Sequence, residues 1–303
     1  MESHQHHHYH HVHNHQIDSL NNVFKISIAL NVLYVAIEAG VGFYVGSLGL
    51  LSDAGHNLGD VFSLLLALLA FRLAKVHPTA RYTYGYKKST ILISLVNALI
   101  LVAAVCLIVA ESIHKFSHPV AVDGTVVSWT AAVGIVVNGL TAWLLMRQQK
   151  GDLNVRGAFL HMAADTLVSL GVVVSGFVIQ QTGCVLVDPV VSLVISVVIL
   201  VSTWRLLKES VSLSLDGVPS SLSKGEVCDL LRNLPHIEDI HHVHIWAIST
   251  TEVALTAHIV LGNMEYMESV KDDVRRTLAA KGIAHCTLEM ELSGCDCRCK
   301  DCE

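Results

Sequence analysis

Two segments of this sequence each place a histidine and an aspartate four residues apart, His56 with Asp60 and His161 with Asp165. Residues at positions i and i+4 share one face of an α-helix, so each segment would present an imidazole beside a carboxylate. Both pairs fall in apolar stretches long enough to span a bilayer, where an ionisable group usually faces a partner or a water-filled path. Two such pairs supply the four nitrogen and oxygen ligands that a tetrahedral zinc ion needs. We therefore predict that these residues bind a divalent metal at membrane depth.

A single buried histidine is equally well explained as a hydrogen-bonded core residue. The repeated spacing, each time with a carboxylate, favours the metal site over that alternative. Two aspartates in a medium of low dielectric constant need a compensating charge, which Zn²⁺ would provide. Because metal binding requires neutral imidazole and ionised carboxylate, metal and protons compete for the same groups. The pattern thus predicts an exchange of protons for metal, with the helices rearranging around a nearly fixed site.

The composition is that of a membrane protein. Of the 303 residues, 52% are hydrophobic and 15% are charged, whereas soluble domains average about 25% charged residues. The mean hydropathy is +0.53, and the net charge of −6 gives no indication of nucleic-acid binding. We expect an all-α bundle of six membrane-spanning helices, over residues 23–45, 49–72, 90–112, 125–146, 157–179 and 187–207.

Lysine and arginine are concentrated in alternate links between these spans. The links after the second and fourth spans and the stretch after the sixth are rich in them, whereas the other links hold few or none. The positive-inside rule places the rich links in the cytoplasm, so both termini are expected there. The short loops favour a bacterial plasma membrane.

The pattern changes near Ser214. Residues 226–234 and 267–281 have helical periodicity, and residues 240–249, 253–261 and 284–292 alternate as strands do. This order predicts a small cytoplasmic α+β domain. The expected organisation is a histidine-rich tail, a transmembrane domain, the cytoplasmic domain and a cysteine-rich tail, over residues 1–19, 20–212, 213–292 and 293–303.

Histidines also gather on the outward face of the predicted sheet. Strict alternation directs the aliphatic residues of each strand inward and leaves four histidines and a glutamate outside, at His242, His244, His258, His285 and Glu289. Solvated histidines without a function are the alternative. The functional interpretation is a regulatory or dimer-bridging zinc site at His244, His258 and His285, with His242 and Glu289 as further candidates.

Both tails carry metal-ligating residues. Residues 4–15 hold eight histidines, and such tracts bind metal weakly and in many arrangements. A purification tag or a solvated tail is the alternative, although the interrupting Gln, Tyr, Val and Asn favour a natural segment. Near the end, four cysteines could bind one Zn²⁺ or Cu⁺ through thiolates, with lipid attachment as the alternative; they are Cys295, Cys297, Cys299 and Cys302. Both tails would raise the local metal concentration at the cytoplasmic mouth.

Several motifs occur in an order that resembles the zinc-transporting branch of the cation diffusion facilitator family. They are GSLGLLSDAGHNLGD at 46–60, YGYKK at 84–88, GAFLHMAAD at 157–165, Asp188–Pro189, and the sequence HIW at 244–246. The resemblance covers residues 20–292. It implies six membrane helices, a cytoplasmic ferredoxin-like domain, a homodimer and proton-coupled metal export.

The resemblance also matches the family's intramembrane metal site to His56, Asp60, His161 and Asp165. Histidine in both motifs is what the family associates with zinc and cadmium rather than manganese or iron. One position departs from the family's pattern, because Thr90 stands where many members carry an acidic residue. A charge pair cannot be carried over to that position.

Two other classes of function were weighed against transport. An intramembrane metalloprotease would need a motif such as His-Glu-x-x-His, which does not occur in this sequence, and an open coordination position for a reactive water. A non-transporting metal sensor would need only the sheet and the tails. It has no reason to bury two His/Asp pairs in lipid, so a transporter is the favoured interpretation and no enzyme activity is expected.

Overall fold

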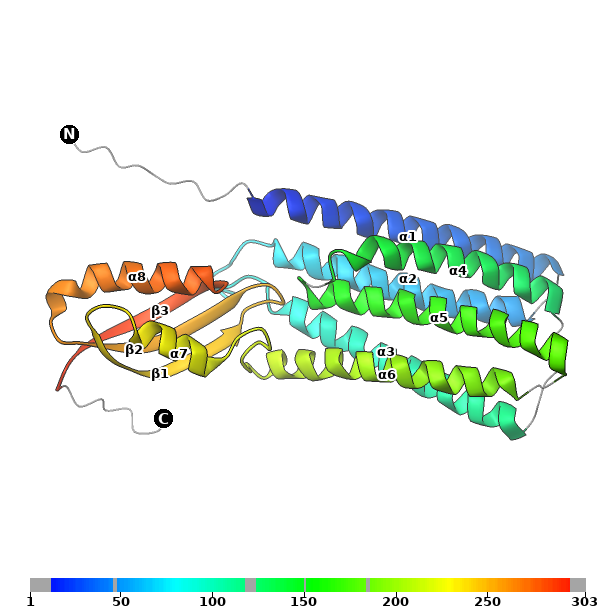
Figure 1. Cartoon of the computed structure of the whole chain (residues 1–303). Coiled ribbons are helices and arrows are strands. Elements are labelled where there is room, and N and C mark those ends of the chain that lie inside the picture. Colours follow the sequence, from blue (N-terminus) through cyan, green and yellow to red (C-terminus); the bar gives the residue numbers. More distant parts are fainter. Residues whose placement is uncertain (1–11, 46–47, 118–123, 150, 184–185, 295–303) are drawn as a thin grey trace. The chain divides into compact units, whose positions relative to one another are not determined.

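The computed structural model describes residues 12–45, 48–117, 124–149, 151–183 and 186–294 (Figure 1). The chain divides into two compact units, which are treated separately. The first comprises residues 1–72 and 96–206, and the second comprises residues 73–95 and 207–303.

Six long helices follow one another at the positions where six spans are predicted. They are α1 (Val12–Val45), α2 (Leu48–Ala74), α3 (Ser89–Ser117), α4 (Gly124–Met146), α5 (Leu153–Thr182) and α6 (Val187–Ser214). Among the described residues, four helices contain a stretch long and apolar enough to cross a bilayer, namely Asn22–Val41, Asn57–Ala74, Ser89–His114 and Val190–Ser214. A shorter apolar stretch, Ala132–Met146, lies in α4.

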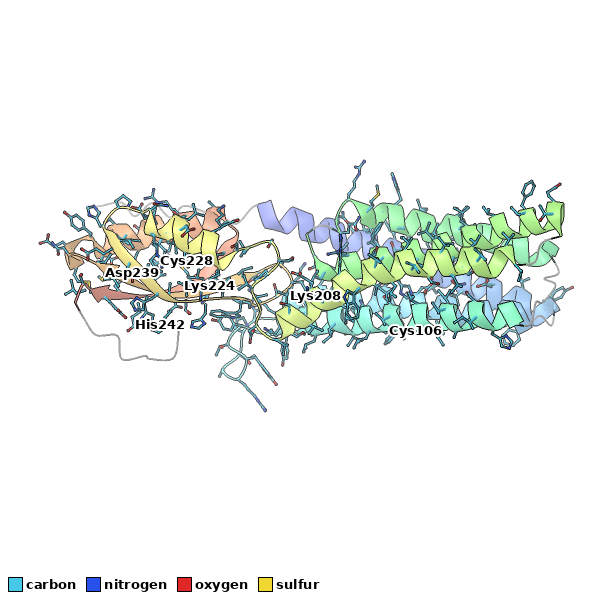
Figure 2. All side chains as sticks on the ribbon, turned by 60° about the horizontal axis from the view of Figure 1, so that its bottom comes forward. Cys106, Lys208, Lys224, Cys228, Asp239 and His242 are labelled. Atoms are coloured by element: carbon cyan, nitrogen blue, oxygen red, sulfur yellow. The ribbon has the colours of Figure 1, made fainter. Side chains whose placement is uncertain are left out.

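The helical unit buries polar side chains and exposes large apolar ones. Asp60 and Glu38 are 0% and 1% exposed, whereas Leu33 and Phe62 are 58% and 54% exposed. Figure 2 shows side chains projecting all along these helices. A bundle in water would show the opposite distribution, because exposed aliphatic surface is unfavourable there. The unit is therefore built for a lipid environment.

A shared core brings α1, α2, α4 and α5 together. Phe24, Leu64, Leu145 and Met162 are fully buried within it, one from each of these helices. Helices α4 and α5 follow one another closely in the chain and pack side by side (Figure 1). This core sets α2 against α5, the two helices that carry the His/Asp motifs.

The second unit contains a three-stranded sheet with two helices on one face. Its elements are α7 (Lys224–Arg232), β1 (Ile237–Ala247), β2 (Val253–Leu261), a 3₁₀ turn (Met264–Tyr266), α8 (Met267–Ala280) and β3 (Ile283–Leu292). The order in the sheet is β1-β2-β3. Strands β1 and β2 are antiparallel, while β2 and β3 are parallel and are joined through α8. The predicted α+β order is confirmed.

One face of this sheet forms the core of the unit. Leu255 and Ile259 of β2 are fully buried and belong to the same cluster as Leu231 of α7 and Val274 of α8. Cys228 of α7 belongs to this core, and His242 of β1 lies on the other side of the sheet (Figure 2). The helices therefore cover one face and leave the histidine-bearing face open.

The segment before α3 is attached to this unit by polar contacts. Lys87 Nζ lies 2.6 Å from Glu252 Oε2, and Lys88 pairs with Asp216. Thr90, the residue that departs from the family's acidic pattern, accepts a hydrogen bond at its hydroxyl from the backbone N–H of Thr250 at 3.0 Å. A hydroxyl thus occupies this position as an acceptor without adding a charge.

Truncating the centre of the sheet should loosen the cytoplasmic unit. Leu255→Ala removes a fully buried side chain and should cost about 2–5 kcal/mol. Amide hydrogen exchange of β1–β3 in the detergent-solubilised chain should then be at least about 30-fold faster. Leu215→Ala, at a position 78% exposed, is the matched control and should leave these rates unchanged. Equal rates in both variants would contradict this core assignment.

Candidate metal centre

Asp60 of α2 and His161 and Asp165 of α5 converge inside the helical unit. One ligand atom of each lies within 4.8 Å of the others. His161 Nε2 is 2.6 Å from Asp60 Oδ1 and 3.8 Å from Asp165 Oδ2. Asp60 and His161 are buried, and Asp165 is partly buried. Three of the four predicted intramembrane residues therefore form one cluster.

Helix periodicity and the shared core explain this convergence. Asp60 lies one turn before Leu64, and His161 precedes Met162, and both apolar residues are fully buried in the cluster that joins α2 to α5. His161 and Asp165 are neighbours on α5 because they are four residues apart. The packing that buries the leucine and the methionine thus also brings the polar groups together.

His161 Nε2 and Asp60 Oδ1 are joined by a hydrogen bond. A distance of 2.6 Å between an imidazole nitrogen and a carboxylate oxygen is that of a hydrogen bond, and it requires a hydrogen between the two atoms. A metal ion coordinated by both atoms would have to displace it. One imidazole and two carboxylates are nitrogen and oxygen ligands that suit Zn²⁺.

The remaining candidates in the helices and tails lie outside the described residues. His56 belongs to α2, but its side chain is not among those described. The same holds for the histidine tract of residues 4–15 and for Cys295, Cys297, Cys299 and Cys302. Their roles stay predictions from the sequence.

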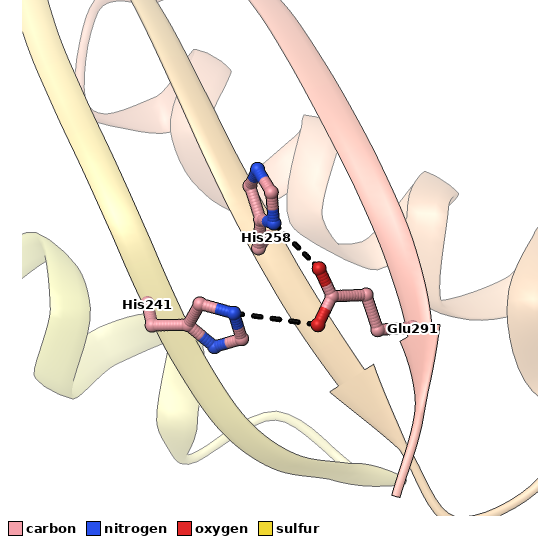
Figure 3. Close-up of side chains that lie close together, drawn as sticks. All are labelled: His241, His258 and Glu291. Atoms are coloured by element: carbon pink, nitrogen blue, oxygen red, sulfur yellow. Dashed lines mark hydrogen bonds and ion pairs between the residues drawn. The ribbon is translucent and has the colours of Figure 1, made fainter. Parts of the chain in front are cut away.

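A second cluster lies on the open face of the sheet (Figure 3). Glu291 of β3 bridges two histidines, with His258 Nδ1 2.5 Å from Oε1 and His241 Nε2 3.3 Å from Oε2. Glu289 adds an oxygen 3.4 Å from His258 Nε2. The ring of His242 is centred 4.9 Å from the rings of both other histidines. Three imidazoles and two carboxylates therefore meet on this surface.

The sequence analysis missed His241 because β1 does not alternate regularly. The pairing of β1 with β2 shifts between His241 and His244, and His242 has a φ of 50°. Ile240 and Val243 are both buried, so both intervening histidines lie away from the core. The spacing of three between these apolar residues was the available signal for a β-bulge. Glu291 was also missed, although it shares the face of Glu289.

The sheet does not bring the three histidines predicted as its zinc ligands into one cluster. His258 of β2 pairs laterally with His241 of β1. His244 pairs instead with Thr256, two residues before His258 on β2. His285 pairs with Ala254, four residues from His258, which corresponds to about 13 Å along a strand. Of the predicted set, His258, His242 and Glu289 come together.

His285 instead contacts an aromatic residue. Its ring meets that of Tyr84 edge-on with centroids 5.5 Å apart, and Tyr84 Oη lies 3.3 Å from His285 Nε2. Both residues belong to the second unit. The contact links β3 to the segment that precedes α3.

Apolar helices that enclose a metal-ligating cluster, together with an α+β domain that carries another, are the architecture of a membrane transporter of metal ions. The sequence matches the family model of the cation efflux transmembrane domain over residues 24–213. It matches the cytoplasmic domain of cation efflux proteins over residues 219–292. The chain belongs to the cation efflux family, the cation diffusion facilitators.

Similar proteins cover almost the whole chain. The zinc transporter ZitB of Escherichia coli (strain K12) is 37% identical over 280 residues, which is 91% of this chain and 89% of that protein. A cadmium, cobalt and zinc/H(+)-K(+) antiporter of Bacillus velezensis is 35% identical over 283 residues, 92% of this chain and 90% of that protein. The metal cation efflux system protein CzcD of Cupriavidus metallidurans is 33% identical over 274 residues, 90% of this chain and 87% of that protein.

These comparisons confirm the predicted family and the predicted class of function. The chain is an integral membrane protein that exports metal cations. The family consists of transporters, so the prediction that the chain is not an enzyme is also confirmed. The metalloprotease alternative is thereby excluded.

The geometry of the sheet predicts which histidine matters for metal binding there. His241→Ala removes a group that touches Glu291 and should weaken zinc binding to the sheet at least about tenfold, or about 1.4 kcal/mol. His244→Ala is the matched control, and it should change the affinity less than threefold. The affinity is measured by chelator competition in a chain that carries Asp60→Asn and lacks the two metal-ligating tails, residues 1–15 and 295–303. A larger effect of His244→Ala would favour the ligand set predicted from strand alternation.

Proposed function

We propose that this protein exports zinc from the cytoplasm in exchange for protons, binding the ion at His56, Asp60, His161 and Asp165. The observation that supports this most directly is the hydrogen bond of 2.6 Å between His161 Nε2 and Asp60 Oδ1. An ion coordinated by both of these atoms would have to take the place of the hydrogen between them. The names of two relatives, a zinc transporter and a zinc/H(+)-K(+) antiporter, agree with this substrate and with proton coupling.

The coupling follows from exclusion at shared atoms. Zn²⁺ and a hydrogen cannot both occupy the space between His161 Nε2 and Asp60 Oδ1. If the empty site carries a proton beyond the one N–H of a neutral imidazole, loading the ion releases that proton. Refilling the empty site with protons prevents the two carboxylates from remaining as uncompensated charges in a low-dielectric medium. A proton gradient directed into the cytoplasm would then drive the ion outward. Rearrangement of the helices around the site would give alternating access.

Cadmium is the second substrate that we propose. Imidazole and carboxylate ligands accept several divalent ions, and selectivity depends on geometry as well as ligand type. Cadmium appears in the name of the Bacillus relative. The same name includes cobalt. We rank zinc before both of these ions.

The sheet cluster would serve as a regulatory zinc site in a homodimer. It lies in the segment that matches the cytoplasmic domain of cation efflux proteins, and its face is not covered by α7 or α8. Zinc bound by His241, His258 and Glu291, with His242 and Glu289 alongside, could join two copies of the domain as cytoplasmic zinc rises. Both termini would lie in the cytoplasm, and the membrane would be the bacterial plasma membrane, because the similar proteins come from bacteria.

Zinc flux into sealed vesicles tests the transport site. Proteoliposomes with an acidic interior should accumulate radioactive zinc from an outside solution at neutral pH, and collapse of the gradient should slow this uptake. Asp60→Asn and His161→Ala should each reduce the initial rate at least about 100-fold, about 2.7 kcal/mol, because each removes a ligand from a buried site. His77→Ala, in the exposed segment after α2, should retain the full rate.

Zinc movement that is indifferent to the pH gradient would contradict proton coupling. Full flux in Asp60→Asn would contradict the assignment of the site, whatever the coupling.

The two tails are expected to aid capture but not translocation. Removing residues 1–15 and 295–303 together should raise the zinc concentration for half-maximal flux about threefold and leave the maximal rate unchanged, since neither segment includes the proposed transport ligands. The comparison is made in the same vesicles over a range of free zinc held by a chelator. Loss of the maximal rate would show that a tail takes part in transport itself.

A further inference from the structure

A buried carboxylate on α1 is not used by the proposed metal site. Glu38 is 1% exposed, and both of its carboxylate oxygens accept hydrogen bonds. Tyr34 donates its hydroxyl to Oε1 at 3.1 Å, and Asn57 donates its Nδ2 to Oε2 at 2.8 Å. An acidic residue at membrane depth is costly and usually has a function.

The partner of Glu38 on α2 lies in the turn that carries the proposed ligands. Asn57 is 5% exposed, follows His56 directly and precedes Asp60 by three residues. Side chains three residues apart on a helix are neighbours on its surface. Fixing Asn57 therefore fixes the rotation of α2 about its axis, and with it the direction in which Asp60 points.

Helix α4 confines the α1 side of this contact. A Cβ atom added at Gly134 would lie 2.9 Å from Tyr34 Oη, so α4 approaches the tyrosine as closely as a glycine allows. Asn31 of α1 also donates a hydrogen bond to Thr141 Oγ1 of α4 at 3.1 Å. Asn31 lies seven residues before Glu38, so this bond attaches an earlier part of α1 to α4, whereas Gly134 confines Tyr34, the partner of Glu38, directly.

We propose that Glu38 and Asn57 are positioning residues for metal binding, and that the hydrogen bond between them sets the rotation of α2 so that Asp60 faces His161. Glu38 acts through Asn57 and does not touch the ion. The inference rests on the proposed transport site. Beyond that site, the proposal is that Glu38, on a third helix (α1), determines how tightly the site binds zinc.

The first test removes the donor while keeping the size of the side chain. Asn57→Leu should raise the zinc concentration for half-maximal flux about tenfold in pH-driven proteoliposomes, with the maximal rate within threefold of the parent. The reason is that Asp60 would be oriented less well when the ion is captured. Asn57→Ala removes the same donor with a smaller side chain, and it replaces the leucine variant if that one is not monodisperse in detergent.

The second test restores the bond with its donor and acceptor exchanged. In the double variant Glu38→Gln with Asn57→Asp, the amide is on α1 and the carboxylate on α2, and the Tyr34 hydroxyl still faces an oxygen. The zinc concentration for half-maximal flux should return to within threefold of the parent. Side-chain size alone would not make the exchanged pair differ from the leucine variant, because leucine, asparagine and aspartate are of similar size.

A matched control removes a different buried bond of α1. Thr141→Val deletes the acceptor of the Asn31 amide on α4 without altering any residue of α2, and it should shift half-saturation less than twofold. An equal shift in Thr141→Val and Asn57→Leu would overturn the proposal, as would half-saturation within twofold of the parent in the Asn57 variant. Failure of the exchanged pair to recover in a monodisperse protein would also overturn it.

Failure of the positioning role can be distinguished from failure of the proposed transport function. If the parent transports zinc and Asp60→Asn abolishes this flux, the transport site is supported. The Asn57 variants then test the positioning role alone. If the parent does not move zinc along the pH gradient, the proposed function fails first. Zinc affinity of the detergent-solubilised parent and Asn57→Leu, measured by chelator competition, then still tests the positioning role.

Discussion

One hydrogen bond in the helical unit, between His161 and Asp60, is the interaction on which the proposed mechanism depends. Its members come from α5 and α2, and Asp60 is completely buried. A carboxylate in such a place must have a proton or a cation beside it, because the cost of an uncompensated charge there is several kcal/mol. Under the proposed mechanism, this constraint would keep a proton at the empty site and would let a divalent ion take its place.

The sheet cluster uses the same kinds of ligand in a different environment. Glu291 bridges His241 and His258, yet these side chains are only partly buried, and that of Glu289 is 67% exposed. Water can compensate their charges, so this site can remain empty of both protons and metal. The buried site beside Asp60 would need one or the other. Such a site is suited to following the metal concentration of its surroundings, whereas the intramembrane site is suited to coupling two fluxes.

The sequence was sufficient to predict a helical bundle followed by an α+β domain, and a neighbouring histidine and aspartate on α5, because helical spacing is regular. The i, i+4 interval fixes His161 beside Asp165 without any knowledge of packing. The sheet face was predicted less well, since one β-bulge in β1 changes which histidines point outward. The partners of His258 depend on strand register, which places His241 beside it and His285 far along β3. Register is a property of the assembled sheet and not of any one strand.

The hydrogen bond from Asn57 to Glu38 could not be predicted from spacing, because it joins residues of separate helices whose rotation only the packed bundle defines. It also bears on how the bundle could move during transport. Helix α2 is tied to α1 at Asn57 and to α5 at Asp60. In the proposed cycle an ion would replace the proton at Asp60 and would itself join α2 to α5. The two helices would then stay together in both the proton-bound and the ion-bound form. Access would then alternate by movement of other helices around this pair, with α1 holding the ligand-bearing turn of α2 at a constant rotation throughout.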